Sequence, residues 1–354
     1  MTRVLLIKTS SLGDVINTWP AVTDLARHTP DLTLDWVVEE SLADILRLHP
    51  AVTGVIPVRM RRWRRAPFAR ESREGLRAFR RRVREAPYDR IIDAQGLIRT
   101  GWIGRLAKGP LCGYDFASIR EAPASLFYDR RFRVGVTLHA AERMRRLFAQ
   151  ALGYETPPCL DFGLNVAPVR PAWLGEGPYV LLLAGTARPG KAWPAANWAD
   201  LGGRLAARGF SVVIPHGTPA EKAGAEALAA AIPGAVAPAP MGLAELAALM
   251  AGAAAVIGVD TGPTHLASAV GAPVVAIFMA SWSEFNGAIG PGYVANLGGP
   301  GAAPTVEAVW AKAEEALAHG RRTGAWPAPH EPDPTLKQRR RFRPSNSGAV
   351  VHRR

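Results

Sequence analysis

The amino-acid sequence predicts an α/β fold with two doubly wound, parallel-sheet domains that face each other across an interdomain cleft. Short β-branched runs alternate with helical patterns in both halves of the chain, as in βαβ units. Each half begins with an apolar run that leads directly into a glycine-bearing polar loop, KTSSLGD at 8–14 and AGTARPGK at 184–191. Residues 154–178 are rich in Pro and Gly, have no sustained period and indicate a connection between the two domains.

In the first half, the apolar run at residues 3–7 predicts the first strand. Helical spacing follows over 15–28, where Pro20 bends the helix or divides a first turn from it. The segment RRWRR at 61–65 reads as a loop that leaves a strand end, ahead of a basic helix at 71–84. The other elements expected in this half are strands at 32–38, 52–58, 91–94 and 110–114, and helices at 42–48 and 139–152.

The second half repeats the alternation, from a first strand at 179–183 to a final helix at 306–319 that Thr305 can cap. The elements expected between them are strands at 211–215, 256–259 and 274–278, and helices at 198–208, 221–231, 243–251 and 266–270. We therefore divide the chain into an N-terminal domain (1–160), a linker (161–178), a C-terminal domain (179–320) and a tail (321–354). The tail is rich in Pro, Arg and Ser and poor in apolar residues, which predicts disorder over most of it.

The composition bounds the class of protein. Of 354 residues 48% are hydrophobic, enough for two cores, and no stretch has the length and apolarity of a membrane span. The N-terminus lacks a signal-peptide pattern, and Cys112 and Cys159 are too few for a disulfide framework, so we expect a reducing, cytoplasmic location. The net charge of +13 is concentrated between Arg59 and Arg90 and in the tail. It indicates an anionic partner, although a genome that favours Arg codons explains part of the excess.

Residues 256–278, VIGVDTGPTHLASAVGAPVVAIF, read as a strand, a polar turn, a short helix and a second strand. Ligands of parallel α/β domains bind past the carboxyl ends of strands, where helix N-termini offer free N–H groups. Asp, Thr, Gly and His at that place suit an anionic or hydroxyl-rich ligand. An ordinary βα turn with Asp or Thr as helix N-cap explains the same residues, and spacing alone leaves both readings open.

Several ligand motifs are absent from the sequence. Neither glycine-bearing loop is the G-x-x-x-x-G-K-[ST] P-loop or the G-x-G-x-x-G fingerprint. No D-x-D pair, no H-E-x-x-H and no Cys pair at metal-ligand spacing occurs either. We therefore expect chemistry without an obligatory metal or other cofactor, in which fixed cations and helix ends balance phosphate charge.

Eight segments in one order resemble the ADP-heptose:lipopolysaccharide heptosyltransferases (glycosyltransferase family 9), most closely their heptosyltransferase I branch. They are IKTSSLGDVI, PAVTDL, DWVVEE, RRWRR, DAQGLIRT, REAPASLFY, KAWPAANW and VDTGPTHLASAVGAPVVAIF, and the resemblance covers residues 1–320. It implies a GT-B architecture of two Rossmann-like domains, with the acceptor on the N-terminal one and the nucleotide sugar on the C-terminal one. The implied reaction is inverting, metal-independent transfer of L-glycero-D-manno-heptose from ADP-heptose to the Kdo region of a lipid A-linked inner core.

Inversion needs one base opposite the departing diphosphate, and Asp14, at the end of the first strand, is the candidate. Asp14 can also cap the following helix, and the two roles can coexist. By resemblance, Lys191 contacts the donor phosphates and offsets leaving-group charge, with an ordinary surface lysine as the alternative. The other donor contacts implied by the resemblance are Thr186, Thr261 and Gly262 for phosphate, Glu221 and Met241 for ribose and adenine, Asp260 for heptose hydroxyls, and His265 for sugar or phosphate. A plain helix residue at 221 and a core methionine at 241 are the alternatives for those two positions.

The RRWRR segment suits an acceptor that carries Kdo carboxylates and lipid A phosphates, because arginine forks pair with both groups. A solvated basic loop is the alternative. The predicted acceptor contacts are Ser10, Ser11, Gly13, Arg61, Arg62, Arg64 and Arg120. The same basic face predicts peripheral attachment to the anionic, cytoplasmic face of the inner membrane.

Two positions depart from the family pattern. Ala187 stands where a second hydroxyl residue is common, and residues 279–293, MASWSEFNGAIGPGY, replace a Gly-Pro-Thr-Asp-type loop. Fine donor contacts and the identity of the sugar are therefore open. Other readings are heptosyltransferase II or a transferase for another donor sugar, a nucleotide-sugar sensor, and a basic nucleic-acid-binding protein. No nucleic acid is expected, because the chain has no recognised reading motif, and the oligomeric state is not predicted.

Overall fold

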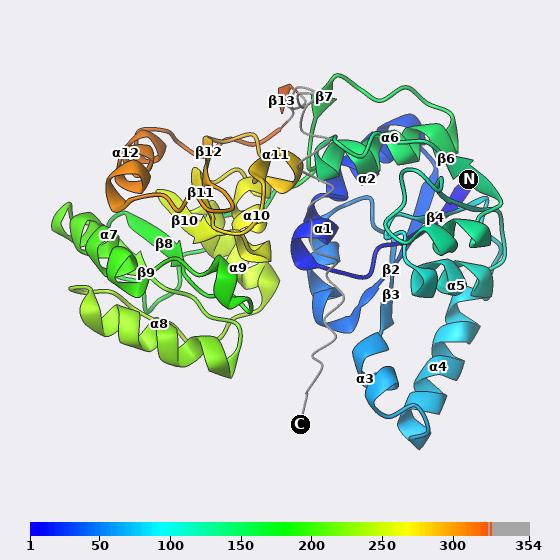
Figure 1. Ribbon diagram of the computed structural model, residues 1–354, viewed down its shortest axis with the longest axis horizontal. Helices are drawn as coiled ribbons and strands as arrows, with labels where there is room; N and C mark the ends of the chain where they lie inside the picture. Colours follow the sequence, from blue (N-terminus) through cyan, green and yellow to red (C-terminus); the bar gives the residue numbers. More distant parts are fainter. Residues whose placement is uncertain (325, 328–354) are drawn as a thin grey trace.

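The computed structural model describes residues 1–324, 326 and 327, which form two α/β domains that lie side by side (Figure 1). Each domain is built on one parallel sheet with helices against it. The predicted α/β class with two parallel-sheet domains is confirmed.

The N-terminal sheet has six parallel strands in the order β3-β2-β1-β4-β5-β6. The strands are β1 (Thr2–Ile7), β2 (Leu32–Glu39), β3 (Gly54–Val58), β4 (Arg90–Asp93), β5 (Leu111–Tyr114) and β6 (Arg130–Phe132). The helices and 3-10 turns are α1 (Leu12–Ile16), α2 (Trp19–His28), η1 (Glu40–Leu42), η2 (Asp44–Leu48), α3 (Met60–Arg65), α4 (Arg70–Val83), α5 (Ile98–Leu106), η3 (Ala122–Phe127) and α6 (Ala140–Leu152). The chain reverses its direction of winding between β1 and β4, and ligands of doubly wound sheets bind outside the carboxyl ends of such a pair.

The C-terminal sheet has five parallel strands in the order β12-β11-β10-β8-β9. The strands are β8 (Tyr179–Leu183), β9 (Ser211–Val213), β10 (Ala255–Val259), β11 (Val274–Phe278) and β12 (Val294–Gly298). The helices and turns are η4 (Pro189–Lys191), α7 (Ala195–Ala207), α8 (Pro219–Ala231), α9 (Leu243–Ala251), α10 (Gly262–Ala269), α11 (Ser283–Asn286) and α12 (Val306–Leu317). Every residue of β8, β10 and β11 is buried, as expected for strands with helices on both faces. Here the winding reverses between β8 and β10.

The helix predicted over 15–28 is divided, as the proline indicated. α1 ends at Ile16 and α2 begins at Trp19, with Pro20 in the first turn of α2. A proline is tolerated there because the first N–H groups of a helix have no intrahelical partner.

The RRWRR segment is a helix, and its prediction as a loop is wrong. Five arginines within residues 59–65 obscure an apolar side chain that fixes the structure, Trp63. The Trp63 ring packs on Phe79 of α4 at 5.9 Å between ring centroids. A Cβ at Gly75 would lie 3.0 Å from Trp63 Nε1, so α3 and α4 approach closely. Helix formation in α3 therefore depends on a contact with a later segment, which local sequence does not reveal.

Two further expectations change in the structure. Residues 42–48 form 3-10 turns and no α-helix. The two-residue strand β7 (Cys159–Leu160) pairs antiparallel with β13 (Trp326–Pro327), and Trp326 stacks on Phe162. The described beginning of the tail is therefore ordered against the N-terminal domain, because Trp326 supplies an apolar anchor. The rest of the predicted disordered tail, residues 328–354 and residue 325, lies outside the described residues.

The two domains touch through the loops that follow β1 and β10. A Cβ at Gly262 would lie 2.6 Å from the Leu12 side chain, and one at Gly13 would lie 2.9 Å from the His265 ring. Glycine at both positions therefore allows α1 and α10 to approach closely. A third contact joins His139, the N-cap of α6, to the carbonyl of Gly287 at 3.1 Å.

Candidate functional site

Asp14 lies on the N-terminal side of this junction, in the third position of α1. Its Oδ2 accepts hydrogen bonds from the backbone N–H and the hydroxyl of Ser11, both at 3.0 Å, which completes a capping box. Its Oδ1 lies 3.9 Å from the Lys8 ammonium, and no hydrogen bond from a described residue reaches it. The Asp14 side chain is 34% exposed. One carboxylate oxygen is thus fixed, and the other is available to a substrate.

Lys8 was not singled out from the sequence. Its side chain is buried at the end of β1, and its ammonium donates to the carbonyl of Ala94 at 3.4 Å. Burial lowers the pKa of Lys8, against the opposing effects of Asp14 and Asp93. Burial opposes ionisation of Asp14, but the Lys8 charge and the Ser11 hydrogen bonds outweigh it and hold the pKa of Asp14 below its usual value. A lysine within KTSSLGD resembles any loop lysine, so only its burial reveals this role.

The loop after β4 supports the loop after β1. The Gln95 side chain accepts hydrogen bonds from the backbone N–H groups of Thr9 at 3.1 Å and Ser10 at 3.3 Å. Asp93 in turn accepts from the backbone N–H of Gln95 at 2.9 Å. The loop after β4 therefore holds the Lys8–Asp14 loop in place by hydrogen bonds. The winding of the sheet reverses between these two strands, β1 and β4.

Asp260 lies on the C-terminal side, between the ends of β10 and β8. Its Oδ2 accepts from the Lys191 ammonium at 2.5 Å and from the Ser281 hydroxyl, and Lys191 also donates to the Asp260 carbonyl at 3.1 Å. The Asp260 side chain is 9% exposed. Burial raises its pKa, but His265 and Lys191 more than compensate and hold the pKa well below its usual range. The structure thus brings the predicted Lys191 and Asp260 into one ion pair and adds Ser281, which sequence reasoning missed within its atypical segment.

His265, Thr261 and Gly262 occupy the first turn of α10 and the residue before it. The Nε2 of His265 lies 3.6 Å from Asp260 Oδ1, and its buried Nδ1 has no hydrogen-bond partner among the described residues. Thr261 is the N-cap of α10 in extended conformation, and its side chain makes no capping hydrogen bond. Among the first residues of α10, Pro263 has no N–H and the Thr264 N–H donates to the Thr261 carbonyl at 3.1 Å, so the Gly262 N–H is the one available to an anion near Lys191.

The other predicted donor residues surround two glycine turns. The Glu221 carboxylate accepts from the backbone N–H of Gly217 at 2.9 Å, and its side chain lies 3.3 Å from where a Cβ of Gly185 would be. Thr186 is half-buried in the loop after β8, and its hydroxyl accepts from the Arg188 N–H at 3.3 Å. Met241 is partly buried against the core ahead of α9, which fits both of its readings.

The predicted acceptor residues fall into two groups. Ser10, Ser11 and Gly13 belong to the loop after β1, beside Asp14. Arg120 is exposed, and its charge helps to lower the pKa of Asp14. The second group is in α3, where Arg61 lies in the helix, Arg64 is exposed and Arg62 donates to Glu71 at 2.5 Å. No described contact joins this second group to Asp14.

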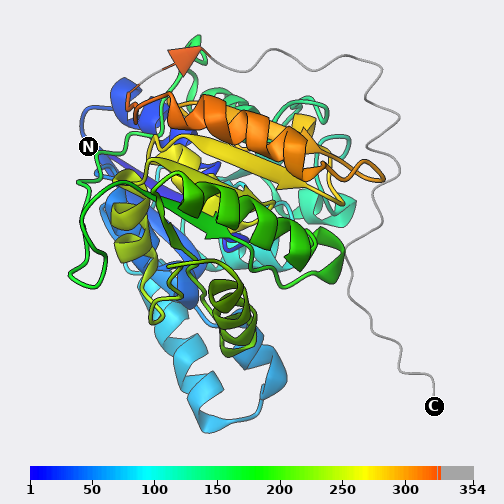
Figure 2. The same cartoon turned by 90° about the vertical axis from the view of Figure 1, so that its left-hand side faces the viewer.

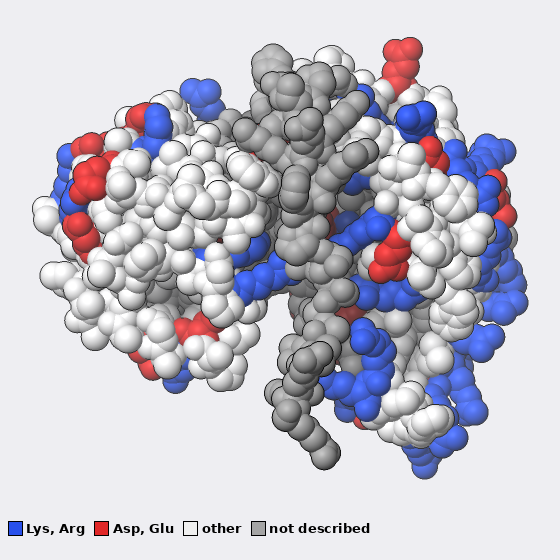
Figure 3. All heavy atoms as spheres, in the orientation of Figure 1, with Lys and Arg blue, Asp and Glu red and all other residues white. Residues whose placement is uncertain are grey.

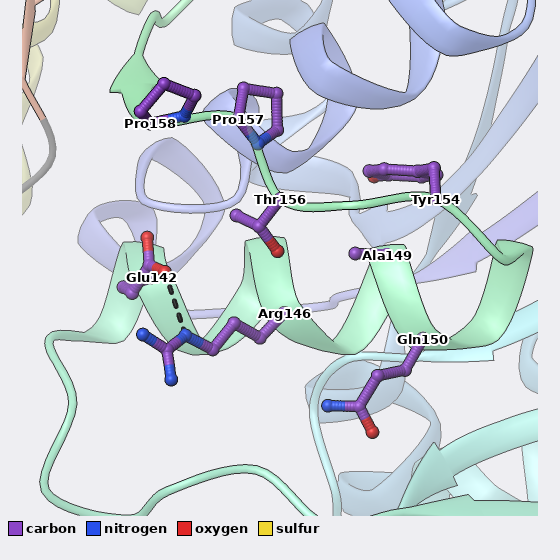
Figure 4. Close-up of a pocket in the computed structure, with 8 residues that line it drawn as sticks. All are labelled: Glu142, Arg146, Ala149, Gln150, Tyr154, Thr156, Pro157 and Pro158. Carbon is purple, nitrogen blue, oxygen red and sulfur yellow. Dashed lines mark hydrogen bonds and ion pairs between the residues drawn. The ribbon is translucent and has the colours of Figure 1, made fainter.

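A shallow pocket of about 500 Å³ opens elsewhere in the N-terminal domain, between α6 and the segment that follows it (Figure 4). Its lining residues are Glu142, Arg146, Ala149, Gln150, Tyr154, Thr156, Pro157 and Pro158. None of the predicted site residues lines this pocket.

The described residues contain no cluster of three or more His, Cys, Asp or Glu side chains that could hold a metal ion. No helix in the same part of the chain has the length and apolarity to span a membrane.

Comparisons with known proteins agree with this arrangement. The family model described as glycosyltransferase family 9 (heptosyltransferase) matches residues 76–313. Lipopolysaccharide heptosyltransferase 1 of Pseudomonas aeruginosa is 46% identical over 290 residues, which cover 81% of each chain. The solved structure of the Escherichia coli heptosyltransferase WaaC with ADP superimposes with a TM-score of 0.81 at 38% identity, over 89% of this chain and 100% of that one. The same enzyme with ADP-2-deoxy-2-fluoro heptose gives 0.79 at 37% identity, over 89% and 99%.

Proposed function

This chain belongs to glycosyltransferase family 9, the heptosyltransferases, and from that premise we propose its donor, acceptor and mechanism. It is a glycosyltransferase with the GT-B architecture, and the resemblance to the heptosyltransferase I branch is confirmed. The proposed reaction moves L-glycero-D-manno-heptose from ADP-heptose to a Kdo hydroxyl of the lipid A-linked inner core. The relatives named heptosyltransferase 1, and the neighbour solved with an ADP-heptose analogue, support this choice.

The single observation that carries the mechanism is the free Oδ1 of Asp14 at the junction of the domains. The acceptor hydroxyl attacks the anomeric carbon of heptose on the face opposite ADP and gives its proton to this oxygen. The bond between the anomeric carbon and the phosphate oxygen breaks, and ADP leaves with the electron pair. One base on one face inverts the configuration at the anomeric carbon.

The charge that develops on ADP is balanced by groups of the C-terminal domain. Lys191 and the free N–H of Gly262 lie at the carboxyl ends of β8 and β10. In the proposed complex Lys191 contacts the diphosphate, while Thr186, Thr261 and Gly262 add phosphate contacts. Asp260 and His265 contact the sugar, and Glu221 and Met241 contact ribose and adenine. We propose that the reaction needs no metal, since these fixed charges do the same electrostatic work.

On the acceptor side, Ser10, Ser11, Gly13 and Arg120 surround Asp14, and Arg61, Arg62 and Arg64 contact more distant anionic groups of the acceptor. We also propose that the enzyme acts at the cytoplasmic face of the inner membrane as a peripheral protein. The gathering of Lys and Arg over the N-terminal domain supports this placement (Figure 3).

The test is transfer from ADP-heptose to Kdo₂-lipid A, detected by mass spectrometry as the addition of one heptose. Parallel reactions with UDP-glucose and GDP-mannose, and with an acceptor that already carries one heptose, distinguish the other donor sugars and the heptosyltransferase II reaction. A further reaction with EDTA tests the metal. We expect product only from ADP-heptose and the unheptosylated acceptor, at the same rate with EDTA. Transfer only to the heptosylated acceptor would contradict the proposal.

A further inference from the structure

Residues 60–83, which we call the α3–α4 hairpin, project from the N-terminal domain in both ribbon views (Figures 1 and 2). The contact between Trp63 and Phe79 holds its two helices together. Phe68 lies in the turn between the helices and is 88% exposed. An aromatic ring this exposed at a projecting turn contributes nothing to the core, and its burial against an apolar partner would be favourable.

The arginines of α4 fall into two sets. Two of them pair with acids, Arg70 with Glu74 at 2.7 Å and Arg82 with Glu85. Four others are exposed at helical spacing and have no ion-pair partner among the described residues. They are Arg73, Arg77, Arg80 and Arg84, which we call the arginine stripe. The spacings of four, three and four residues place them in one row along the helix.

From these two features we propose that the α3–α4 hairpin is a membrane-docking element that binds the surface of an anionic phospholipid bilayer. The arginine stripe lies along the headgroups, and Phe68, at the N-terminal end of α4, inserts into the boundary with the acyl chains. Charge complementarity selects the anionic lipid, and the apolar ring next to it distinguishes this surface from one that binds charge alone.

This inference rests on the proposed function, because a lipid A-linked acceptor is itself anchored in a bilayer. α3 follows β3 at the carboxyl edge of the N-terminal sheet, the edge that also carries the Lys8–Asp14 loop. Docking through the hairpin therefore brings the acceptor side of the enzyme to the surface where the acceptor lies.

The experiment is co-sedimentation of the full chain with vesicles of phosphatidylethanolamine and phosphatidylglycerol, and with vesicles of phosphatidylcholine alone. We expect binding to the anionic vesicles only. The triple variant R73Q/R77Q/R80Q should bind on the order of a hundredfold more weakly, from roughly fivefold for each basic residue at an anionic surface. Phe68→Ser should bind roughly tenfold more weakly, and this loss should persist at high salt because it is apolar.

Two matched variants control for net charge and for exposed apolar surface. R170Q/R204Q/R208Q removes three charges from the linker and the C-terminal domain, and Val169→Ser removes an exposed apolar side chain outside the hairpin. Both should bind like the wild type. Equal losses of vesicle binding in R170Q/R204Q/R208Q and R73Q/R77Q/R80Q would overturn the proposal, and so would unchanged vesicle binding by Phe68→Ser. The proposal would also fail if R73Q/R77Q/R80Q bound an oligonucleotide more weakly but bound vesicles like the wild type.

Transfer to a soluble Kdo disaccharide without acyl chains separates this inference from the proposed function. Phe68→Ser should transfer heptose to the soluble acceptor at the wild-type rate and to vesicle-borne Kdo₂-lipid A more slowly. Absence of transfer by the wild type would contradict the proposed function, while vesicle binding would still report on the hairpin. Equal rates of the two proteins on both acceptors would contradict docking through Phe68.

Discussion

The loops that follow β1 and β10 each place an aspartate beside a lysine at the junction of the domains, but the two pairs differ in their geometry. The Lys8 ammonium lies 3.9 Å from Asp14 Oδ1, beyond hydrogen-bond distance, and the Asp14 side chain is 34% exposed. The Lys191 ammonium lies 2.5 Å from Asp260 Oδ2, and the Asp260 side chain is 9% exposed.

The difference separates a carboxylate with one open oxygen from a carboxylate with a partner beside each oxygen. Asp14 keeps one oxygen open, while its lysine acts on it through charge from a buried position. Asp260 has Lys191 and Ser281 on one oxygen and His265 close to the other, and its pKa is held well below its usual range. A carboxylate stabilised so strongly as the anion is a weak base. Asp260 is therefore suited to hold Lys191 and the donor in place.

The largest expected effect is on the open carboxylate. Asp14→Asn should lower kcat by a factor of about 10²–10⁴, the range for removal of a general base, because its amide cannot take the acceptor proton. The KM for ADP-heptose should change little, since Asp14 belongs to the acceptor side. Steady-state kinetics with varied donor measure both values. A near-normal kcat would remove Asp14 as the base.

The second variant breaks the closed pair. Lys191→Ala should lower kcat/KM for ADP-heptose by roughly ten- to a hundredfold, because a buried carboxylate is left without its cation and the diphosphate loses a partner. Lys191→Arg keeps the charge and is the matched control. If only the KM for the acceptor changed, Lys191 would not serve the donor.

The third variant sharpens the role of the buried lysine. Lys8→Met removes a charge that lowers the pKa of Asp14, so that pKa should rise. Because the base must be ionised, the acidic limb of the profile of kcat/KM against pH should move to higher pH. Lys191→Ala should leave that limb in place. An unmoved limb in Lys8→Met would mean that Lys8 supports the fold alone.

The smallest expected effect concerns the hydrogen bond of His139 to Gly287, one of the contacts that join the domains. His139 accepts a hydrogen bond from the Ala141 N–H at its Nδ1 and therefore carries its proton on Nε2, which donates to Gly287. Burial lowers its pKa from 6.5 to about 4. Between these two values the unfolded chain binds the proton and the folded chain does not, so stability falls as the pH falls, by up to about 1.4 kcal/mol per pH unit. Urea unfolding of His139→Asn should show a shallower dependence over this window, and an unchanged slope would contradict the assignment.

The parallel sheets could be predicted because buried strands are encoded locally. The strands at 179–183 and 274–278 have the predicted bounds, since a run of apolar residues ends at a loop in each case. The helix α3 could not be predicted, because Trp63 packs on a residue that is distant in sequence. The apolar residues at 42–48 predict a buried helical segment, but they do not distinguish an α-helix from the 3-10 turns that the structure has there.

The candidate site was predictable where a residue type and its place at a strand end coincide. Asp14 and Asp260 meet that condition, and the structure places both at the reversals of winding in their sheets. Lys8 and Ser281 do not, because their importance depends on burial and on a partner from another loop. The pairing of Lys191 with Asp260 also depends on β8 and β10 being neighbours in the sheet. These two strands are far apart in the sequence, so their pairing is not visible in it.

The most direct test of the difference between the two aspartates is the single-turnover rate of heptose transfer at saturating ADP-heptose and acceptor. Asp14→Asn and Asp260→Asn are compared with the wild type at one pH. Saturation removes the effect of weaker donor binding, so that the rate reports the chemical step. We predict that Asp14→Asn loses at least about a hundredfold and that Asp260→Asn retains a much larger share of the wild-type rate. A larger loss in Asp260→Asn than in Asp14→Asn would contradict the assignment of the base.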